Sequence, residues 1–220
     1  MGLREQKAQR TRTAIADAAL DLFERQGYDA TPMEQIAEAA QVSPSTLYRY
    51  FPTKDATLLD HPGMDLASLS AELDRRPADE PLAEALGAAV RAALEQADAH
   101  ADQLLRLRRQ LDVTPVARAR LWDLWHAQRT RLEEAIAARA GVPAGTLWVQ
   151  LSAHTCLLVV QMALDRVRAT PTPGSAVAHA AEVMAGLAGP DLVLPRLPPV
   201  AEDPLPAAPV ADGPAPQGRA

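Results

Sequence analysis

The sequence predicts an all-α fold, and three observations support this. Aromatic residues make up only 4% of the 220 residues, alanine is frequent, and the Val, Ile and Thr runs typical of strands are few. Over most of the chain the apolar residues recur at intervals of three and four, the period of an amphipathic helix. A chain of this length suits one small and one medium domain. We expect a domain at residues 1–53, a second at residues 54–189, and a tail at residues 190–220.

The first helix is expected over residues 8–26. Its apolar residues, among them Ile15, Leu22 and Phe23, recur at helical spacing, and Gly27 provides the stop. Ahead of this helix lies an arm with four cations against the single acid Glu5, the kind of segment that lies along a phosphate backbone. These cations are Arg4, Lys7, Arg10 and Arg12.

Residues 31–51, TPMEQIAEAAQVSPSTLYRYF, contain two helix starts separated by a short turn. At the first start, Thr31 is expected to cap the helix, Pro32 to take its first position, and Glu34 to complete a capping box. The second start repeats this with Ser43 as the cap and Pro44 behind it. Four apolar positions would let the two helices cross around one small core, namely Ile36, Ala37, Val42 and Leu47.

The outward face of the second helix of this pair is rich in hydroxyls and carries an arginine, at Ser45, Thr46, Tyr48, Arg49 and Tyr50. Such groups contact phosphate oxygens and base edges when a helix enters the major groove. The pattern therefore indicates a helix-turn-helix that reads DNA. Capped helix pairs also occur in helical proteins that never touch DNA, so a helical adaptor that binds only protein is the alternative. The basic arm and the hydroxyl-rich helix favour DNA.

The charge of the chain restricts how it would bind DNA. Up to and including Lys54 the chain has seven Lys and Arg residues and seven Asp and Glu residues, so this segment is formally neutral. The whole net charge of -6 lies beyond it. A pI near 5.4 argues against broad non-specific adhesion to nucleic acid, which depends on neutralising phosphates. Binding must depend on where the cations lie and on pairing two such domains on one operator.

After the helix pair, Thr53 is expected to cap a further helix with Lys54 in its first turn. A lysine there is unfavourable for the helix dipole, so a phosphate partner would explain it, as would plain solvent exposure. The sequence at 61–63, His-Pro-Gly, predicts either a kink or a simple loop before a helix resumes over residues 64–75. Further helices are expected at residues 80–98, around Leu104, Leu107 and Leu111, at 115–140, at 145–169 and at 175–188.

Residues 10–58 closely resemble the TetR family of bacterial transcriptional regulators. The resemblance rests on AALDLFERQGYDAT followed by the S-x-x-TLYRYF-x-x-K run. It implies a three-helix DNA-binding domain followed by a helical ligand-binding and dimerisation domain. Many relatives carry a basic residue or glycine at the positions of Pro44 and Ser45. The candidate DNA-binding residues are Thr31, Ser43, Pro44, Ser45, Thr46, Tyr48, Arg49 and Lys54, with Tyr48 and Lys54 implied to meet phosphates.

The last two helices carry more Ala, Leu, Val and Met than one buried face needs. The family resemblance implies that two copies pair through a four-helix bundle of these helices. We therefore expect a homodimer that places two recognition helices in successive major grooves of a roughly palindromic duplex. The apolar residues expected to serve the core and the partner are Leu147, Leu151, Leu158, Met162, Val177, Ala181, Met184 and Leu187.

The run from RRPADEPL to AIAARAG resembles regulatory domains of TetR-type proteins described as binding acyl-CoA-like molecules. This implies an apolar pocket for an acyl chain, with Arg106 and Arg109 for the CoA phosphates. The alternatives are that the tryptophans are core residues, that the arginines form a solvated face, and that His126 and His154 are hydrogen-bonded core histidines. The candidate ligand-binding residues are Arg106, Leu107, Arg109, Leu121, Trp122, Trp125, His126, Trp148, Leu151 and His154.

Other classes of function lack the residues they need. No Ser-His-Asp spacing, Gly-rich phosphate loop or local histidine pairing is present, so we expect no enzyme, no metal site and no cofactor. The single Cys156 excludes an internal disulfide. No signal peptide is visible, and the most apolar stretch, LSAHTCLLVVQMAL, is about 14 residues long, too short for a bilayer. We expect a soluble, cytoplasmic protein.

The tail from residue 190 holds nine of the chain's 19 prolines and no helical period, so it is expected to be disordered. The sequence as a whole predicts a repressor that a small apolar or acyl-CoA-like effector releases from operator DNA. The helical protein-binding adaptor stays the alternative.

Overall fold

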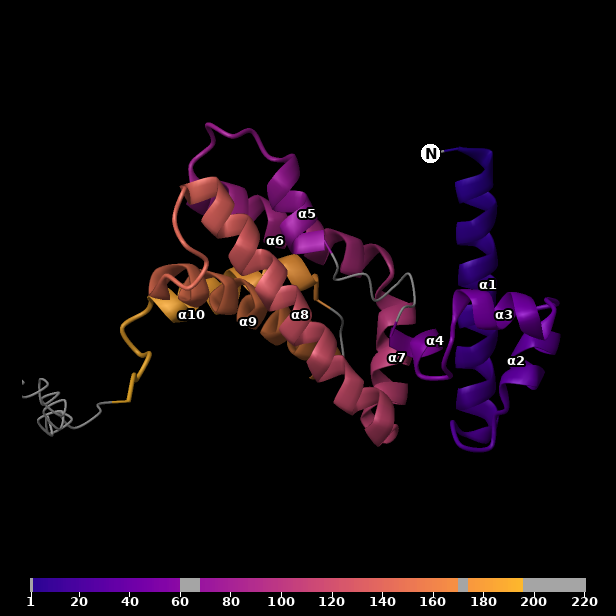
Figure 1. Ribbon diagram of the computed structural model, residues 1–220. Helices are drawn as coiled ribbons and strands as arrows, with labels where there is room; N and C mark the ends of the chain where they lie inside the picture. Colours follow the sequence, from indigo (N-terminus) through magenta and orange to yellow (C-terminus); the bar gives the residue numbers. More distant parts are fainter. Residues whose placement is uncertain (1, 60–67, 170–173, 196–220) are drawn as a thin grey trace, which may run out of the picture.

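The computed structural model describes residues 2–59, 68–169 and 174–195, and every regular element in these ranges is a helix. The all-α prediction is confirmed. Figure 1 shows a small part built around α1 beside a larger helical part. The helices are α1 (Leu3–Gln26), α2 (Met33–Ala39), α3 (Pro44–Tyr50), α4 (Ala56–Leu59), α5 (Ser68–Arg75), α6 (Leu82–Ala99), α7 (Ala101–Val113), α8 (Pro115–Ala140), α9 (Leu147–Ala169) and α10 (Ala176–Ala188).

The small part has its core where α2 and α3 pack against α1. Ile15, Phe23, Ile36, Leu47 and Phe51 are all buried there. The predicted core positions Ile36, Ala37 and Leu47 are confirmed, with Val42 partly buried beside them. The recognition-type helix α3 therefore rests on an apolar base and turns its other side outward.

The basic arm is helical, which the sequence reading missed. Helix α1 begins at Leu3 rather than near residue 8, and the Glu5 carboxylate accepts a hydrogen bond of 2.7 Å from the Gly2 backbone N–H. An acid in the first turn stabilises a helix start because it satisfies a free N–H and complements the helix dipole. The predicted end is confirmed, since Gly27 follows the helix with a φ of 87°.

The two predicted caps have opposite outcomes. Ser43 caps α3 as expected and accepts a hydrogen bond of 3.2 Å from the Thr46 backbone N–H. The capping box at Thr31 is wrong, because Thr31 is fully buried and its hydroxyl donates to the Gly27 carbonyl at 2.7 Å. Helix α2 begins at Met33 with Pro32 as an N-cap that offers no side-chain bond.

The turn between α2 and α3 places Gln41 at a φ of 55°, a left-handed conformation that disfavours side chains with a Cβ. Gln41→Gly is therefore expected to stabilise the protein by up to about 1 kcal/mol, the relief of strain exceeding the entropy that glycine adds to the unfolded chain. Urea unfolding followed by circular dichroism measures this. A lower unfolding midpoint in the glycine variant would show that Gln41 is not strained.

The segment after α3 differs from expectation. Helix α4 begins at Ala56, so Lys54 lies in the preceding turn, and the Thr53 hydroxyl accepts a hydrogen bond of 3.2 Å from Arg120 instead of capping the helix. The predicted break at His61-Pro62-Gly63 lies outside the described residues. The following helix, α5, is described from Ser68.

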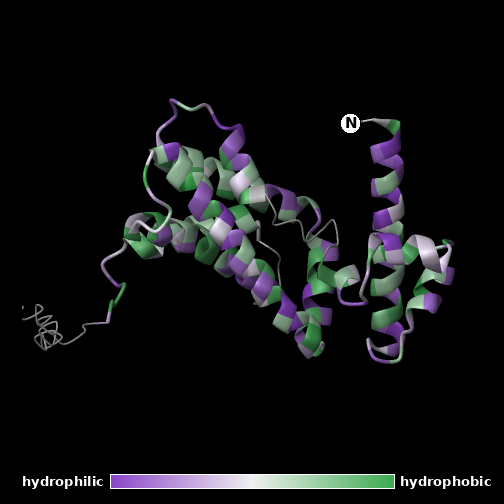
Figure 2. Ribbon diagram, in the orientation of Figure 1, coloured by the Kyte–Doolittle hydropathy of each residue, from purple (hydrophilic) through white to green (hydrophobic). Residues whose placement is uncertain are grey.

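The larger part is formed by α5 to α10, and its predicted helices agree closely with the structure. Leu104, Leu107 and Leu111 are buried on α7, and Gly141 ends α8 in the left-handed conformation. Helix α8 packs against α5, α7 and α9, while α9 packs against α10. Figure 2 shows that α9 and α10 are more apolar than α8. Residues 190–195 of the predicted tail are described without a helix.

Helix α9 extends well beyond the 14-residue stretch on which the membrane argument rested. At 23 residues it is long and apolar enough to cross a membrane by length and composition. In the structure it packs as a core helix, with seven buried side chains that include Val149, Ala153 and Val160. Contacts with neighbouring helices therefore account for part of its apolar character, and other apolar side chains of α9 stay exposed.

Candidate functional site

Helix α3 presents a polar face to solvent. Ser43, Ser45, Tyr48 and Arg49 are exposed, and Thr46 is half-buried beside them. The Ser43 hydroxyl lies 3.0 Å from that of Ser45 and 2.9 Å from that of Thr46, so three hydroxyls form one hydrogen-bonded group at the start of the helix. Pro44, in the first helical turn, is also exposed.

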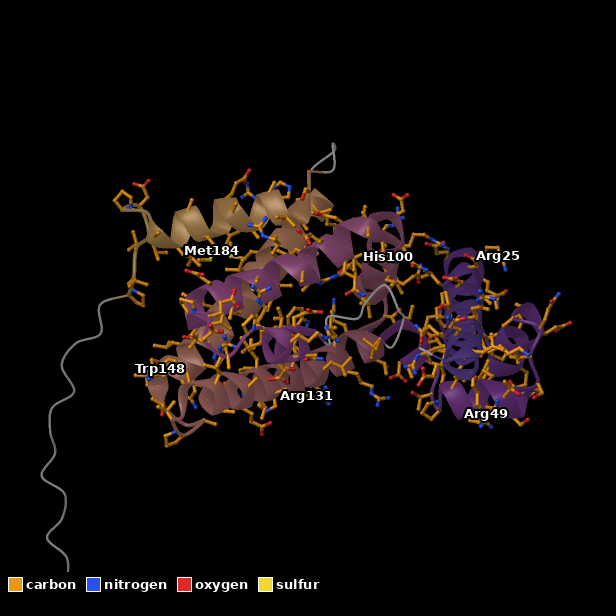
Figure 3. All side chains as sticks on the ribbon, turned by 90° about the horizontal axis from the view of Figure 1, so that it is seen from above. Arg25, Arg49, His100, Arg131, Trp148 and Met184 are labelled. Atoms are coloured by element: carbon orange, nitrogen blue, oxygen red, sulfur yellow. The ribbon has the colours of Figure 1, made fainter. Side chains whose placement is uncertain are left out.

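The two larger side chains of this face are free to reach a ligand. The Tyr48 hydroxyl contacts Glu34 of α2 only at 3.5 Å, the outer limit of a hydrogen bond. The Arg49 guanidinium lies 5.4 Å from the centre of the Tyr50 ring, and no carboxylate of the described chain pairs with it. Figure 3 shows Arg49 on the side of the small part opposite to Arg25. A cation and several hydroxyls thus project from one short helix.

Thr31 and Lys54 do not belong to this face. The buried Thr31 side chain cannot meet DNA in this conformation. The Lys54 ammonium donates hydrogen bonds to the Tyr28 carbonyl at 2.6 Å and the Thr31 carbonyl at 3.0 Å, and it lies 4.3 Å from the centre of the Tyr28 ring. Lys54 therefore ties the loop after α1 to the segment before α4. Burial, with Asp55 and Asp29, raises the pKa of the Tyr28 phenol to about 12.

We therefore expect Lys54→Met to lower the free energy of unfolding by about 1–2 kcal/mol, because two backbone carbonyls lose a charged donor. The slope of log DNA affinity against log salt should stay unchanged, since no phosphate contact is removed. Arg10→Met, on the exposed surface of α1, is the control that leaves stability unchanged. If the slope of log affinity against log salt falls by about one in the Lys54 variant, Lys54 contacts a phosphate as the sequence predicted.

The first half of α1 adds positive charge near α3. Arg4, Lys7 and Arg10 are exposed on this helix, which extends past α2 and α3 in Figure 1. Arg12 lies over the buried ring of Phe51 at 5.2 Å. The cations predicted for the basic arm are thus held on a helix.

Ion pairs join the small part to the large one. Arg106 of α7 pairs with Asp21 and Glu24 of α1, at 2.5 and 2.6 Å. Arg120 of α8 pairs with Asp55 at 2.6 Å. The predicted role of Arg106 at CoA phosphates therefore conflicts with its position, because its guanidinium is held by two carboxylates on the α1 side of α7. Arg109 is exposed, and Leu107 is fully buried.

A groove of about 650 Å³ lies between α8 and α9 and gathers part of the predicted ligand set. Trp122, Trp125, His126, Leu151 and His154 line it, together with Arg129 and Leu158. Trp122 is 67% exposed, so the alternative that it is a core residue is wrong. Trp148 is 41% exposed and does not line the groove, while Leu121 lines a smaller adjoining hollow.

The histidines of the groove are not core residues either. His126 and His154 are both exposed, and Arg129 lies between them, with nitrogen atoms 2.9 Å from His126 Nδ1 and 3.4 Å from His154 Nε2. Arg129 also approaches Glu133 at 3.3 Å. Sequence reasoning missed Arg129, although its spacing of three residues from His126 places both on one face of α8.

Cys156 is not a nucleophile in this setting. Burial raises the pKa of its thiol to about 11, so the thiol is protonated at neutral pH.

Comparison with known proteins agrees with this geometry. Residues 15–60, from the core of α1 through α4, match the profile described as "Bacterial regulatory proteins, tetR family". Over these residues the chain is similar to this family. Family members are transcriptional regulators and not enzymes, and their HTH-type domain corresponds to the small part of the structure.

Among its relatives, the chain is 37% identical over 148 residues to the HTH-type transcriptional regulator TcmR of Streptomyces glaucescens, covering 64% of this chain and 65% of TcmR. It is 39% identical over 75 residues to the HTH-type transcriptional repressor KstR of Mycolicibacterium smegmatis, covering 34% and 36%. The chain thus matches less than two thirds of the length of these relatives. A putative fatty acid metabolism regulator of Clostridium perfringens shares the fold, with a TM-score of 0.54 at 16% identity over 79% of this chain and 96% of that one.

Proposed function

We propose that the protein binds a specific DNA duplex through α2 and α3 and represses transcription until a small effector releases it. The observation that carries this proposal is the exposed face of α3, where Ser45, Tyr48 and Arg49 project from a helix held by the buried Leu47. Thr46 adds a hydroxyl at the edge of this face. These groups match the donors that bind phosphates and base edges in a major groove. We expect this regulator to act in the cytoplasm.

A homodimer is part of the proposal. Helices α9 and α10 expose large apolar side chains that no described residue covers, and such a surface is typical of a protein interface. They are Leu147, Trp148, Leu151, Leu158, Met162 and Met184, of which Leu151 and Leu158 also border the groove between α8 and α9. A second copy paired on this surface would bring two α3 helices to one duplex. Of the other residues expected at the interface, Ala181 is exposed, while Val177 and Leu187 are partly buried in the core.

The effector of this proposal is small and largely apolar, because apolar atoms form most of the surface of the groove between α8 and α9, where two tryptophans and three leucines lie among six polar residues. An acyl-CoA would place its chain on the same residues but needs cations for its phosphates. Since α1 already holds Arg106, only Arg109 of the two expected arginines stays exposed. We therefore favour an effector without the CoA group.

Fluorescence anisotropy tests the DNA-binding proposal. A duplex enriched from a random pool on the full-length protein is titrated beside a scrambled duplex at several salt concentrations. We expect preference for the enriched duplex of at least about 10³-fold and an affinity that falls steeply with salt. Equal and salt-independent binding to both duplexes, or no binding, would favour the helical protein-binding adaptor.

The interface has its own test. Met162→Glu combined with Met184→Glu is expected to convert a dimer to a monomer in analytical ultracentrifugation, because two carboxylates from each protomer would be buried against apolar partners. Val113→Glu, at a 72% exposed position on α7, is the control that leaves the dimer intact. A double variant that sediments as the wild type would place the interface elsewhere.

A further inference from the structure

A small hollow of about 170 Å³ lies where α7, α8 and the second half of α9 meet. Arg108 contributes to it from α7, Arg118 from α8 and Arg168 from α9, while Asp112 and Asp165 are the acids in its wall. Arg108 occupies the α7 face that also carries Leu104, Leu107 and Leu111, all of them buried. The position of Arg108 on an apolar helix face is visible in the sequence and indicates a buried arginine. Of the arginines on this helix, only Arg106 and Arg109 are predicted from the sequence as ligand-binding candidates.

The Arg108 guanidinium is buried without its full set of partners. Its Nε and Nη2 atoms are both inaccessible to solvent, and neither has a hydrogen-bond partner among the described residues. Burial lowers the pKa of Arg108, nearby Asp165 opposes this, and Arg168 adds to it. A guanidinium stays charged at neutral pH even so. Unsatisfied buried donors are uncommon in folded proteins, and each calls for an acceptor.

The acids of the hollow do not supply that acceptor. The Asp112 carboxylate pairs with Arg168 at 2.6 Å, and its backbone carbonyl accepts from Arg118 at 3.4 Å. Asp165 attracts Arg108 through its charge but forms no ion pair with it. Three arginines against two aspartates leave the hollow with one excess positive charge.

The hollow adjoins the apolar groove between α8 and α9. Trp122, Trp125 and Gln161 belong to the walls of both. A ligand lying along the two would meet a buried cation at one end and, in the groove, two tryptophans and three leucines set among polar side chains. A guanidinium that borders such a hollow is the cation best matched in shape and charge to a carboxylate.

We propose that the joined pocket binds an amphipathic organic carboxylate, with its charged end facing the Arg108 guanidinium and its apolar body against Trp122 and Trp125. This inference rests on the proposed function, since it names the chemical class of the effector. It also explains why a regulator keeps a buried charge that its own residues leave unpaired: the ligand supplies the counter-ion. Thioesters, which lack a free carboxylate at the end of the chain, fit this pocket poorly.

Isothermal titration of the full-length protein without DNA tests the site. Octanoate and octanamide, and 2-naphthoate and 2-naphthamide, are two pairs that differ in charge but hardly in shape. At least one carboxylate is expected to bind at least tenfold more tightly than its amide. Arg108→Met should remove this preference, whereas Arg109→Met, which removes an exposed charge one residue along α7, should keep it. Equal binding of acid and amide in both pairs, no binding of either acid, or a preference that survives in Arg108→Met would overturn the proposal.

Thermal unfolding separates a binding role for Arg108 from a structural one. The free Arg108→Met protein is expected to melt at the same or a higher temperature than the wild type, because an unpaired buried charge is removed. A clearly lower melting temperature would show that Arg108 already has its partner within the protein and would overturn the proposal.

DNA anisotropy without ligand is measured in parallel. If the protein binds DNA normally but shows no preference for carboxylates, the proposed DNA-binding function is supported and only the proposed class of effector is contradicted. A carboxylate that binds through Arg108 without changing DNA affinity supports the site and removes its regulatory role.

Discussion

Replacing Leu47 with alanine is expected to abolish specific DNA binding while the large part of the protein stays folded. Leu47 is fully buried and is the residue through which α3 is anchored to Ile36 and the core of α1. Truncating a buried leucine costs about 2–5 kcal/mol, from lost transfer free energy and the cavity that remains. A helix of seven residues has little stability of its own, so α3 would no longer hold its outward face in place.

The measurement combines DNA anisotropy with two probes of unfolding. All three tryptophans lie at residue 122 or beyond, so their fluorescence reports the large part alone, whereas circular dichroism reports both parts. In Leu47→Ala we expect the tryptophan transition to be unchanged and an earlier helical transition to appear. Tyr48→Phe, at the neighbouring exposed position, is the control that keeps the fold. Wild-type affinity in the Leu47 variant would mean that α3 is not the DNA-reading element.

Arg49→Ala is expected to weaken binding to the enriched duplex by about 1–3 kcal/mol, roughly a fivefold to 150-fold loss, and binding to scrambled DNA much less. The physical reason is that its exposed guanidinium has no carboxylate partner in the described chain and can bond two acceptors on a guanine edge. Thr46→Ala should show the same direction with a smaller loss, because a hydroxyl makes one bond where the guanidinium makes two.

Arg25→Ala is the matched control for this prediction. It removes the same charge from the side of the small part opposite to Arg49 (Figure 3), so it should leave both affinities nearly unchanged. If Arg49→Ala loses equal affinity on both duplexes, Arg49 contacts a phosphate and the base-reading role passes to other residues of α3.

The sequence predicted the helices well because their ends depend on local signals. Gly27, Ser43 and Gly141 mark helix ends in the structure as they do in the sequence, since a cap or a left-handed glycine acts within one turn of chain. The outward face of α3 followed from the period of its apolar positions for the same reason. The predicted cap at Thr31 is wrong because its hydroxyl donates to a carbonyl of the preceding turn. This bond depends on how α1 meets α2, which local sequence does not determine.

Long-range pairing is what the sequence could not supply. Lys54 bonds carbonyls 23 and 26 residues away, and Arg106 bonds carboxylates 82 and 85 residues away. Both were assigned to phosphates because an unpaired cation in the sequence offers no sign of such partners. Arg108 is the opposite case: in the sequence it is one arginine among eight on α7 and α8, yet the fold buries two of its donors without an acceptor in the described part of the chain.

Hydroxyl-radical footprinting of the enriched duplex tests the central claim most directly, because it shows how many recognition helices meet the DNA and where. We predict two protected patches on one face of the duplex, with centres about 34–36 Å or a multiple of that apart, as two α3 helices of a dimer in separate major grooves require. Both patches should vanish with Leu47→Ala at the same protein concentration. A single patch, or no protection at concentrations that saturate the anisotropy, would contradict the dimeric helix-turn-helix account.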